Sequence, residues 1–121
     1  MKADKLIYDD NQGRYRASGQ AFTGQRMSIY IEDLLLHLAL AAPDIVAAHE
    51  GYSVASLTAA QWRRENQAVV AEADESTPPH ACDPCHGLVI GTKANKLRAR
   101  MAKASRLDVV GDTSFADESR R

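Results

Sequence analysis

The polar segment "DESTPPHACDPCHG", residues 74–87, constrains the fold more than any other feature of the chain. It contains three prolines and ends in a glycine, so it is predicted to be a loop that no helix or strand crosses. The chain has 121 residues, of which 45% are hydrophobic, and this suits one ordinary globular domain. We therefore expect a single core and no second domain.

The chain after this loop has the pattern strand, helix, strand. Residues 88–91, "LVIG", form a short apolar strand candidate, and residues 94–105, "ANKLRARMAKAS", are strongly helical and basic. A second strand candidate, "LDVV", follows at 107–110. This succession is typical of a parallel pair of strands joined by a crossover helix. We therefore expect an α/β fold with a small, mostly parallel sheet flanked by helices.

The chain before the loop begins with extended structure. Residues 5–22 are predicted to form a hairpin that turns around "NQG" at 11–13. A helix is predicted to begin at Ser28, a good N-cap, because apolar residues recur at helical spacing after it. It is expected to end by Ala42, because Pro43 cannot donate a backbone hydrogen bond.

Two further runs precede the loop. Residues 56–73, "SLTAAQWRRENQAVVAEA", predict another helix. The run "DIVAA" at 44–48 fits either a buried strand or the start of a helix, and periodicity does not separate the two. The first ten residues lack the apolar region of a signal peptide, and the apolar run 34–42 is too short to span a bilayer. A cytoplasmic location without a membrane partner is expected.

The charges are balanced overall but clustered locally. The chain has 15 basic and 16 acidic side chains, so its overall field is weak. The stretch from 93 to 106 nevertheless carries six cations and no acid: Lys93, Lys96, Arg98, Arg100, Lys103 and Arg106. Attraction to phosphate or nucleic acid is therefore expected to come from this stretch.

Several short motifs occur in the order that is typical of one known family. They are "AFTG" at 21–24, "RMS" at 26–28, "LVIG" at 88–91, Lys103-Ala104, and "VVGDTSF" at 109–115. In this order the chain resembles a BRCT domain of the bacterial type found in NAD-dependent DNA ligases and clamp-loader large subunits. The resemblance implies an N-terminal extension at 1–14 and one BRCT-like domain at 15–121. The long separation of "DIVAA" from "LVIG" requires an insertion at about 49–87 that includes a helix.

The resemblance also implies a phosphate-binding site. In BRCT domains that bind phosphate, the hydroxyl at the position of Thr23 and the backbone N–H at the position of Gly24 contact the phosphate. Glycine has no Cβ to obstruct a ligand, and N–H groups beside a helix N-terminus form an anion-binding concavity. A cation from the basic helix completes the site, and both Lys96 and Arg100 are candidates. Arg26 would be a further donor, since guanidinium pairs with phosphate bidentately.

The segment "HACDPCHG" carries four potential metal ligands, His80, Cys82, Cys85 and His86. Cys-x2-Cys with a flanking histidine suits tetrahedral zinc, and His80, His49 or water would supply the fourth ligand. The same residues also match the attachment motif of c-type haem and a thioredoxin-like redox motif. The expectation is an exposed loop with two free thiols and no cofactor, and zinc is the alternative.

The expected function is binding rather than catalysis, because paired carboxylates, a nucleophile with its base, and a phosphate loop are all lacking from the sequence. The expected partner is DNA, through a 5′-phosphate end or its backbone, or a phosphorylated protein, in DNA repair or replication in a bacterium or phage. One alternative is a DNA-binding regulator with a helix-turn-helix at 44–64. Another is a small structural or protein-interaction protein that associates through its apolar helices.

Overall fold

The computed structural model describes residues 1–72 and 83–120 of the chain and shows a mixed α/β fold. Its strands are β1 (Leu6–Asp9), β2 (Arg14–Ala17), β3 (Arg26–Tyr30), β4 (Val54–Ser56), β5 (Ala68–Ala71), β6 (His86–Ile90) and β7 (Arg106–Val109). Its α-helices are α1 (Glu32–His37), α2 (Ala42–Ile45), α3 (Ala59–Arg64), α4 (Asn95–Ala104) and α5 (Ser114–Ser119). Three single 3-10 turns are η1 (Ala3–Lys5), η2 (Gly19–Ala21) and η3 (Asp83–Cys85).

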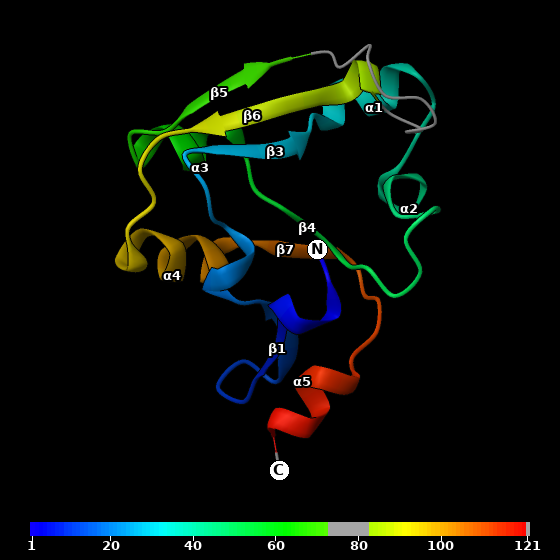
Figure 1. Ribbon diagram of the computed structural model, residues 1–121, viewed down its shortest axis with the longest axis vertical. Coiled ribbons are helices and arrows are strands. Elements are labelled where there is room, and N and C mark those ends of the chain that lie inside the picture. Colours follow the sequence, from blue (N-terminus) through cyan, green and yellow to red (C-terminus); the bar gives the residue numbers. More distant parts are fainter. Residues whose placement is uncertain (73–82, 121) are drawn as a thin grey trace.

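The described strands form three small sheets that are arranged in tiers (Figure 1). The three-stranded sheet β3-β6-β5 lies at the top of the view, the pair β4-β7 lies across the middle beside α4, and the β1-β2 hairpin lies below with α5. No helix within residues 1–72 and 83–120 is long and apolar enough to cross a membrane.

The main core lies between the upper sheet and α4. Its buried members are Ala17, Phe22, Trp62, Val89, Leu97, Met101 and Ala102. Helix α4 contributes three of them from one face, as the spacing of apolar residues in an amphipathic helix requires. Phe22 and Trp62 meet edge to face with their ring centroids 5.8 Å apart, a favourable arrangement of two aromatic rings. The core therefore joins the central strand β6 to the basic helix that follows it.

The predicted N-terminal hairpin is confirmed. Leu6 pairs with Ala17 and Asp9 pairs with Arg14 across β1 and β2. The turn between the strands is closed by a hydrogen bond from the N–H of Gly13 to the carbonyl of Asp9. Gly13 has φ +65°, a left-handed conformation that favours glycine. The expected extension at 1–14 thus forms the first strand and the turn of this hairpin.

The expectation of a mostly parallel sheet is not met, because every strand pair in the described part of the chain is antiparallel. Strand β6, helix α4 and strand β7 occur in the expected order, but β7 does not pair with β6. It pairs with β4 instead, while both edges of β6 are occupied by β3 and β5. The crossover helix α4 therefore leads out of one sheet into another, and a parallel pair does not form.

Two predicted helices are partly strand. The prediction of a helix from Ser28 is wrong for its first residues, because Arg26–Tyr30 alternate between exposed and half-buried positions and pair with β6 as strand β3. The helix α1 begins only at Glu32. The predicted helix at 56–73 ends at Arg64, after which Asn66 adopts φ +60° and the chain returns as strand β5.

The segment at 44–64 does not form a helix-turn-helix. Residues of "DIVAA" contribute to α2, which has only four residues. Strand β4 lies between α2 and α3, whereas the helix-turn-helix motif joins its two helices by a short turn. Thr58 caps α3 instead: its hydroxyl accepts from the N–H of Gln61, and the Gln61 amide oxygen accepts from the N–H of Thr58. A DNA-reading helix at this place is therefore not supported.

Candidate phosphate-binding surface

Thr23 and Gly24 lie in the short loop between η2 and β3, and both are exposed. Gly24 has φ +95°, and a Cβ built on it would meet no atom within 4 Å. The backbone here is therefore open to a ligand on the outer side of the loop. The sequence placed these residues at the end of a strand that leads into a helix, whereas the structure places them just before a strand.

The loop that contains Gly24 is tied to the loop that leads from β6 into α4. The N–H of Gly91 donates to the carbonyl of Gln25 at 2.9 Å, and the hydroxyl of Thr92 donates to the side-chain oxygen of Gln25 at 3.3 Å. The ammonium of Lys93 donates to the carbonyl of Gly24 at 2.7 Å. These bonds hold the two loops side by side where α4 begins.

Lys93 is the residue at this place that sequence reasoning did not assign to the site. Its ammonium also donates to the carbonyls of Val89 and Gly91, at 3.0 and 2.9 Å. Partial burial lowers the pKa of the Lys93 ammonium, because desolvation disfavours its charged form. Lys93 is the first cation of the basic stretch, and this was the one signal available in the sequence. The sequence could not show that its carbonyl partners lie both in the loop of Gly24 and along β6 and the residue after it.

The start of α4 leaves its first backbone N–H groups without a side-chain partner. The N-cap residue Ala94 offers no capping side chain, and the first turn carries no acid. The first N–H groups of a helix have no partner within the helix and carry a partial positive charge. Lys96 stands in this first turn, is exposed, and has no hydrogen bond or ion pair to any residue that the structure describes. The predicted cation Lys96 is therefore available for a ligand.

The other two predicted cations are already paired. Arg100 donates from Nε and a terminal nitrogen to the two carboxylate oxygens of Glu65, at 2.7 and 2.6 Å. This bidentate pair lowers the pKa of Glu65 and raises that of Arg100. Arg26 lies at the start of β3 and contacts Glu72 at 3.3 Å. Both acids lie far away in sequence, so these pairings were not visible in the local pattern.

The Cys/His segment is described only in part. His80 and Cys82 lie outside the described residues. The expectation of an exposed loop is wrong at its end, because Cys85 is fully buried against Leu35 in a small second apolar cluster and strand β6 begins at His86. The Nδ1 atom of His86 lies 2.9 Å from the carbonyl oxygen of Glu72. No three potential metal ligands gather within residues 1–72 and 83–120, so the zinc site stays a prediction that involves the two residues outside them.

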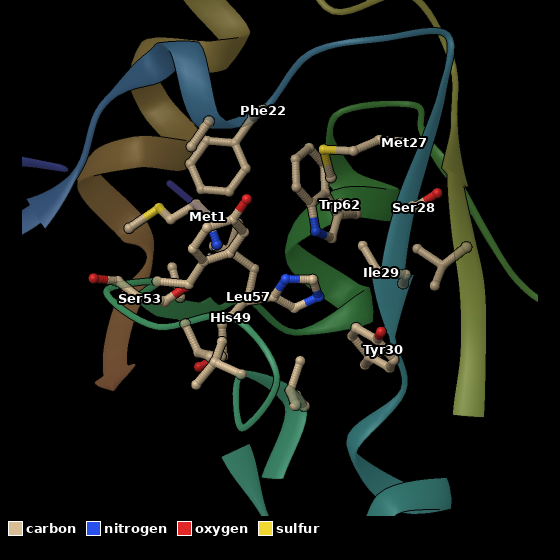
Figure 2. A pocket seen from close by; sticks show the side chains of 18 of the residues that line it. Met1, Phe22, Met27, Ser28, Ile29, Tyr30, His49, Ser53, Leu57 and Trp62 are labelled. Atoms are coloured by element: carbon tan, nitrogen blue, oxygen red, sulfur yellow. Dashed lines mark hydrogen bonds between the residues drawn. The ribbon is translucent and has the colours of Figure 1, made fainter. Parts of the chain in front are cut away.

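A cavity of about 400 Å³ is a second feature that the sequence did not predict. It opens between β3 and the segment that carries β4, and its walls include Phe22, Ile29, His49 and Trp62 (Figure 2). These residues come from separate segments of the chain, so no local motif marks them.

Comparison of the chain with protein-family models, with curated proteins and with solved structures finds no match.

Proposed function

We propose that this protein is a binding module without catalytic activity that holds a phosphate group at the start of α4. The phosphate belongs to DNA, at a 5′ end or in the backbone, or to a phosphorylated protein. The hydroxyl of Thr23 and the backbone of Gly24 form one side of the site, and Lys96 and the first N–H groups of α4 form the other. Lys93 contributes by fixing the loop of Gly24 against the loop that begins α4.

One observation carries this proposal: two loops that are distant in sequence are tied together at a helix N-terminus that has neither a capping side chain nor an acid. Such a place favours an anion through unpaired N–H groups and the helix dipole. The paired cations Arg26 and Arg100 are assigned to the edge of the surface, because a ligand would have to displace a glutamate from each.

Kinship with BRCT domains remains a proposal as well. The motifs around Thr23 and Lys103-Ala104 support it, and so does the order of β6, α4 and β7. The antiparallel pairing of β3, β5 and β6 speaks against it, because the family resemblance implied a mostly parallel sheet. The phosphate site does not depend on this kinship, since its chemistry follows from the local arrangement of Gly24, Lys93 and α4.

Fluorescence anisotropy with a short labelled duplex, with and without a 5′-phosphate, tests the proposal. We expect the wild-type protein to prefer the phosphorylated end, and Thr23→Ala combined with Lys96→Gln to remove this preference. Backbone contacts should also make the affinity fall with salt, with a log–log slope of roughly −0.9 for each phosphate contacted. A phosphoserine peptide and its unphosphorylated form, measured in the same way, identify a protein ligand.

Lys103→Gln is the matched control. Lys103 is exposed on the same helix and lies about 10 Å further along the axis, at 1.5 Å per residue. This variant loses the same charge as Lys96→Gln. It should lower the affinity for both duplexes equally, while the preference for the duplex with the 5′-phosphate remains. If the protein distinguishes neither duplex end nor phosphopeptide from its unphosphorylated form, the proposed function is wrong.

A further inference from the structure

The cavity beside β3 is separate from the surface just described. None of Thr23, Gly24, Lys93 and Lys96 contributes to its walls. Its volume of about 400 Å³ lies within the range of small-molecule sites in proteins, about 300 to 1,000 Å³. What it binds can therefore be considered independently of phosphate binding.

One end of the cavity is apolar and aromatic. Phe22 and Trp62, which form the edge-to-face pair of the core, line it, and both are almost fully buried. Met27 and Ile29 project from β3 toward the same space (Figure 2). These side chains are held by the core, so this wall exists before a ligand arrives. Flat aromatic rings suit such a wall, because aromatic pairs gain energy beyond the area that they bury.

The other end of the cavity carries an imidazole. His49 is exposed, and its ring stacks on that of Tyr52 with the centroids 4.9 Å apart and the planes 21° from parallel. Figure 2 shows the imidazole among the side chains that line the cavity, with Leu57 and Tyr30 nearby. Stacking on Tyr52 fixes the plane of the imidazole, so its N–H is a positioned donor. Hydroxyl groups of Ser28, Ser53 and Ser56 also line the cavity.

We propose that this cavity binds a small planar aromatic molecule that carries one acidic or hydrogen-bond-accepting group. The rings lie against Phe22, Met27 and Trp62, and the polar group accepts a hydrogen bond from His49. A site of this kind, mostly apolar with a few placed polar groups, is the usual form of a small-molecule pocket. This polar group distinguishes the ligand from a purely apolar one, because only a ligand that carries such a group accepts a hydrogen bond from His49.

Two fluorescent probes test the proposal, the anionic 1-anilinonaphthalene-8-sulfonate and the neutral N-phenyl-1-naphthylamine. The chain has one tryptophan, and Trp62 lines the cavity. Energy transfer from Trp62 to a bound probe therefore reports binding, and the variants described below locate the bound probe in this cavity. We expect saturable transfer at one site per molecule. His49→Ala should lower the affinity for the anionic probe about tenfold, as loss of a hydrogen bond to a charged group predicts. The affinity for the neutral probe should stay nearly unchanged.

Neighbouring residues of β5 supply the matched pair of variants. Val69 lines the cavity, whereas Val70 does not and is exposed. Val69→Phe should abolish binding of both probes by filling the space, and Val70→Phe should preserve it. Ile29→Phe fills the same cavity from β3 and replaces Val69→Phe if that variant does not fold. Equal binding by the filled and the control variants, or equal weakening of the two probes by His49→Ala, would overturn the proposal.

Discussion

At the scale of single residues, the carboxylate of Asp9 shows how one side chain stabilises a turn. It accepts from Nε of Arg16 at 2.8 Å and from the backbone N–H groups of Asn11 and Gln12, at 3.0 and 3.2 Å. The side chain of Asp9 is only 9% exposed. The hydrogen bond from Arg16, with the backbone donors, lowers the pKa of Asp9 below its ordinary value of 3.8. Ionisation of Asp9 therefore stabilises the folded state relative to the unfolded chain.

This lowered pKa predicts a loss of stability in acid. Well above the ordinary pKa of 3.8, Asp9 is ionised in both the folded and the unfolded state, and its contribution to stability is complete. As the pH falls through the ordinary value of 3.8 toward the lowered pKa, the unfolded chain takes up the proton first and the contribution is lost. Unfolding temperatures measured between pH 7 and 2 should fall less steeply for Asp9→Asn than for the wild type. Asp10→Asn is the control, because Asp10 is exposed, and it should keep the wild-type slope.

At the scale of elements, β6 is the strand on which the upper sheet depends. It pairs with β3 on one edge and with β5 on the other, and its residue Val89 is fully buried. Gly87 lies where the neighbours come closest: a Cβ there would lie 2.8 Å from both the Val70 carbonyl oxygen and the Ile31 side chain. A side chain at this position would therefore force the neighbouring strand and Ile31 to shift.

Gly87→Ala should destabilise the protein by about 1–3 kcal/mol, the usual cost of forcing an extra group into a packed site. Gly19→Ala is the matched control, because the nearest atom to a Cβ at Gly19 is 3.5 Å away and this is an ordinary contact. Chemical denaturation gives both free energies of unfolding. Similar values for the two variants would show that the packing around Gly87 yields more easily than the distances indicate.

Helices and strands that are marked by a short local pattern could be predicted from the sequence, whereas the pairing of one strand with another could not. The hairpin, β6, α4 and β7 each carry a turn, an apolar run or a helical period. In contrast, "RMSIYIEDLLL" at 26–36 fits a strand and a helix in succession, and the helical period concealed β3. The pairing of β7 with β4 depends on segments about fifty residues apart. At the candidate site, Thr23, Gly24 and Lys96 are exposed. Glu65 and Glu72, which pair with Arg100 and Arg26, lie 35 and 46 residues from them in sequence, so the local pattern did not reveal these pairs.

At the scale of the whole molecule, the segments before and after residues 73–82 are interleaved. Strands β3 and β5 pair with β6, and β4 pairs with β7. The hairpin is the one sheet among the described residues that uses a single side of this segment, and even it is held by α5: the hydroxyl of Tyr15 donates to Asp117 at 2.5 Å, and the guanidinium of Arg120 lies 3.7 Å from the ring centroid of Tyr8.

Interleaving predicts that the protein survives a cut within residues 73–82. Two co-expressed fragments, 1–77 and 78–121, should copurify as a one-to-one complex and unfold together. Their unfolding temperature should rise with protein concentration, because association has become bimolecular. Fragments that purify separately, each with its own unfolding transition, would contradict this arrangement of the sheets.

The pairing of β4 with β7 also has a consequence in time. During synthesis, β4 leaves the ribosome some fifty residues before its partner, and β3 and β5 likewise wait for β6. Until then, the apolar faces of these strands are uncovered and the hairpin alone can close. At about 5–20 residues per second, the nascent chain spends seconds in this state, so a chaperone that shields extended apolar segments would act on this protein before its last strands are made.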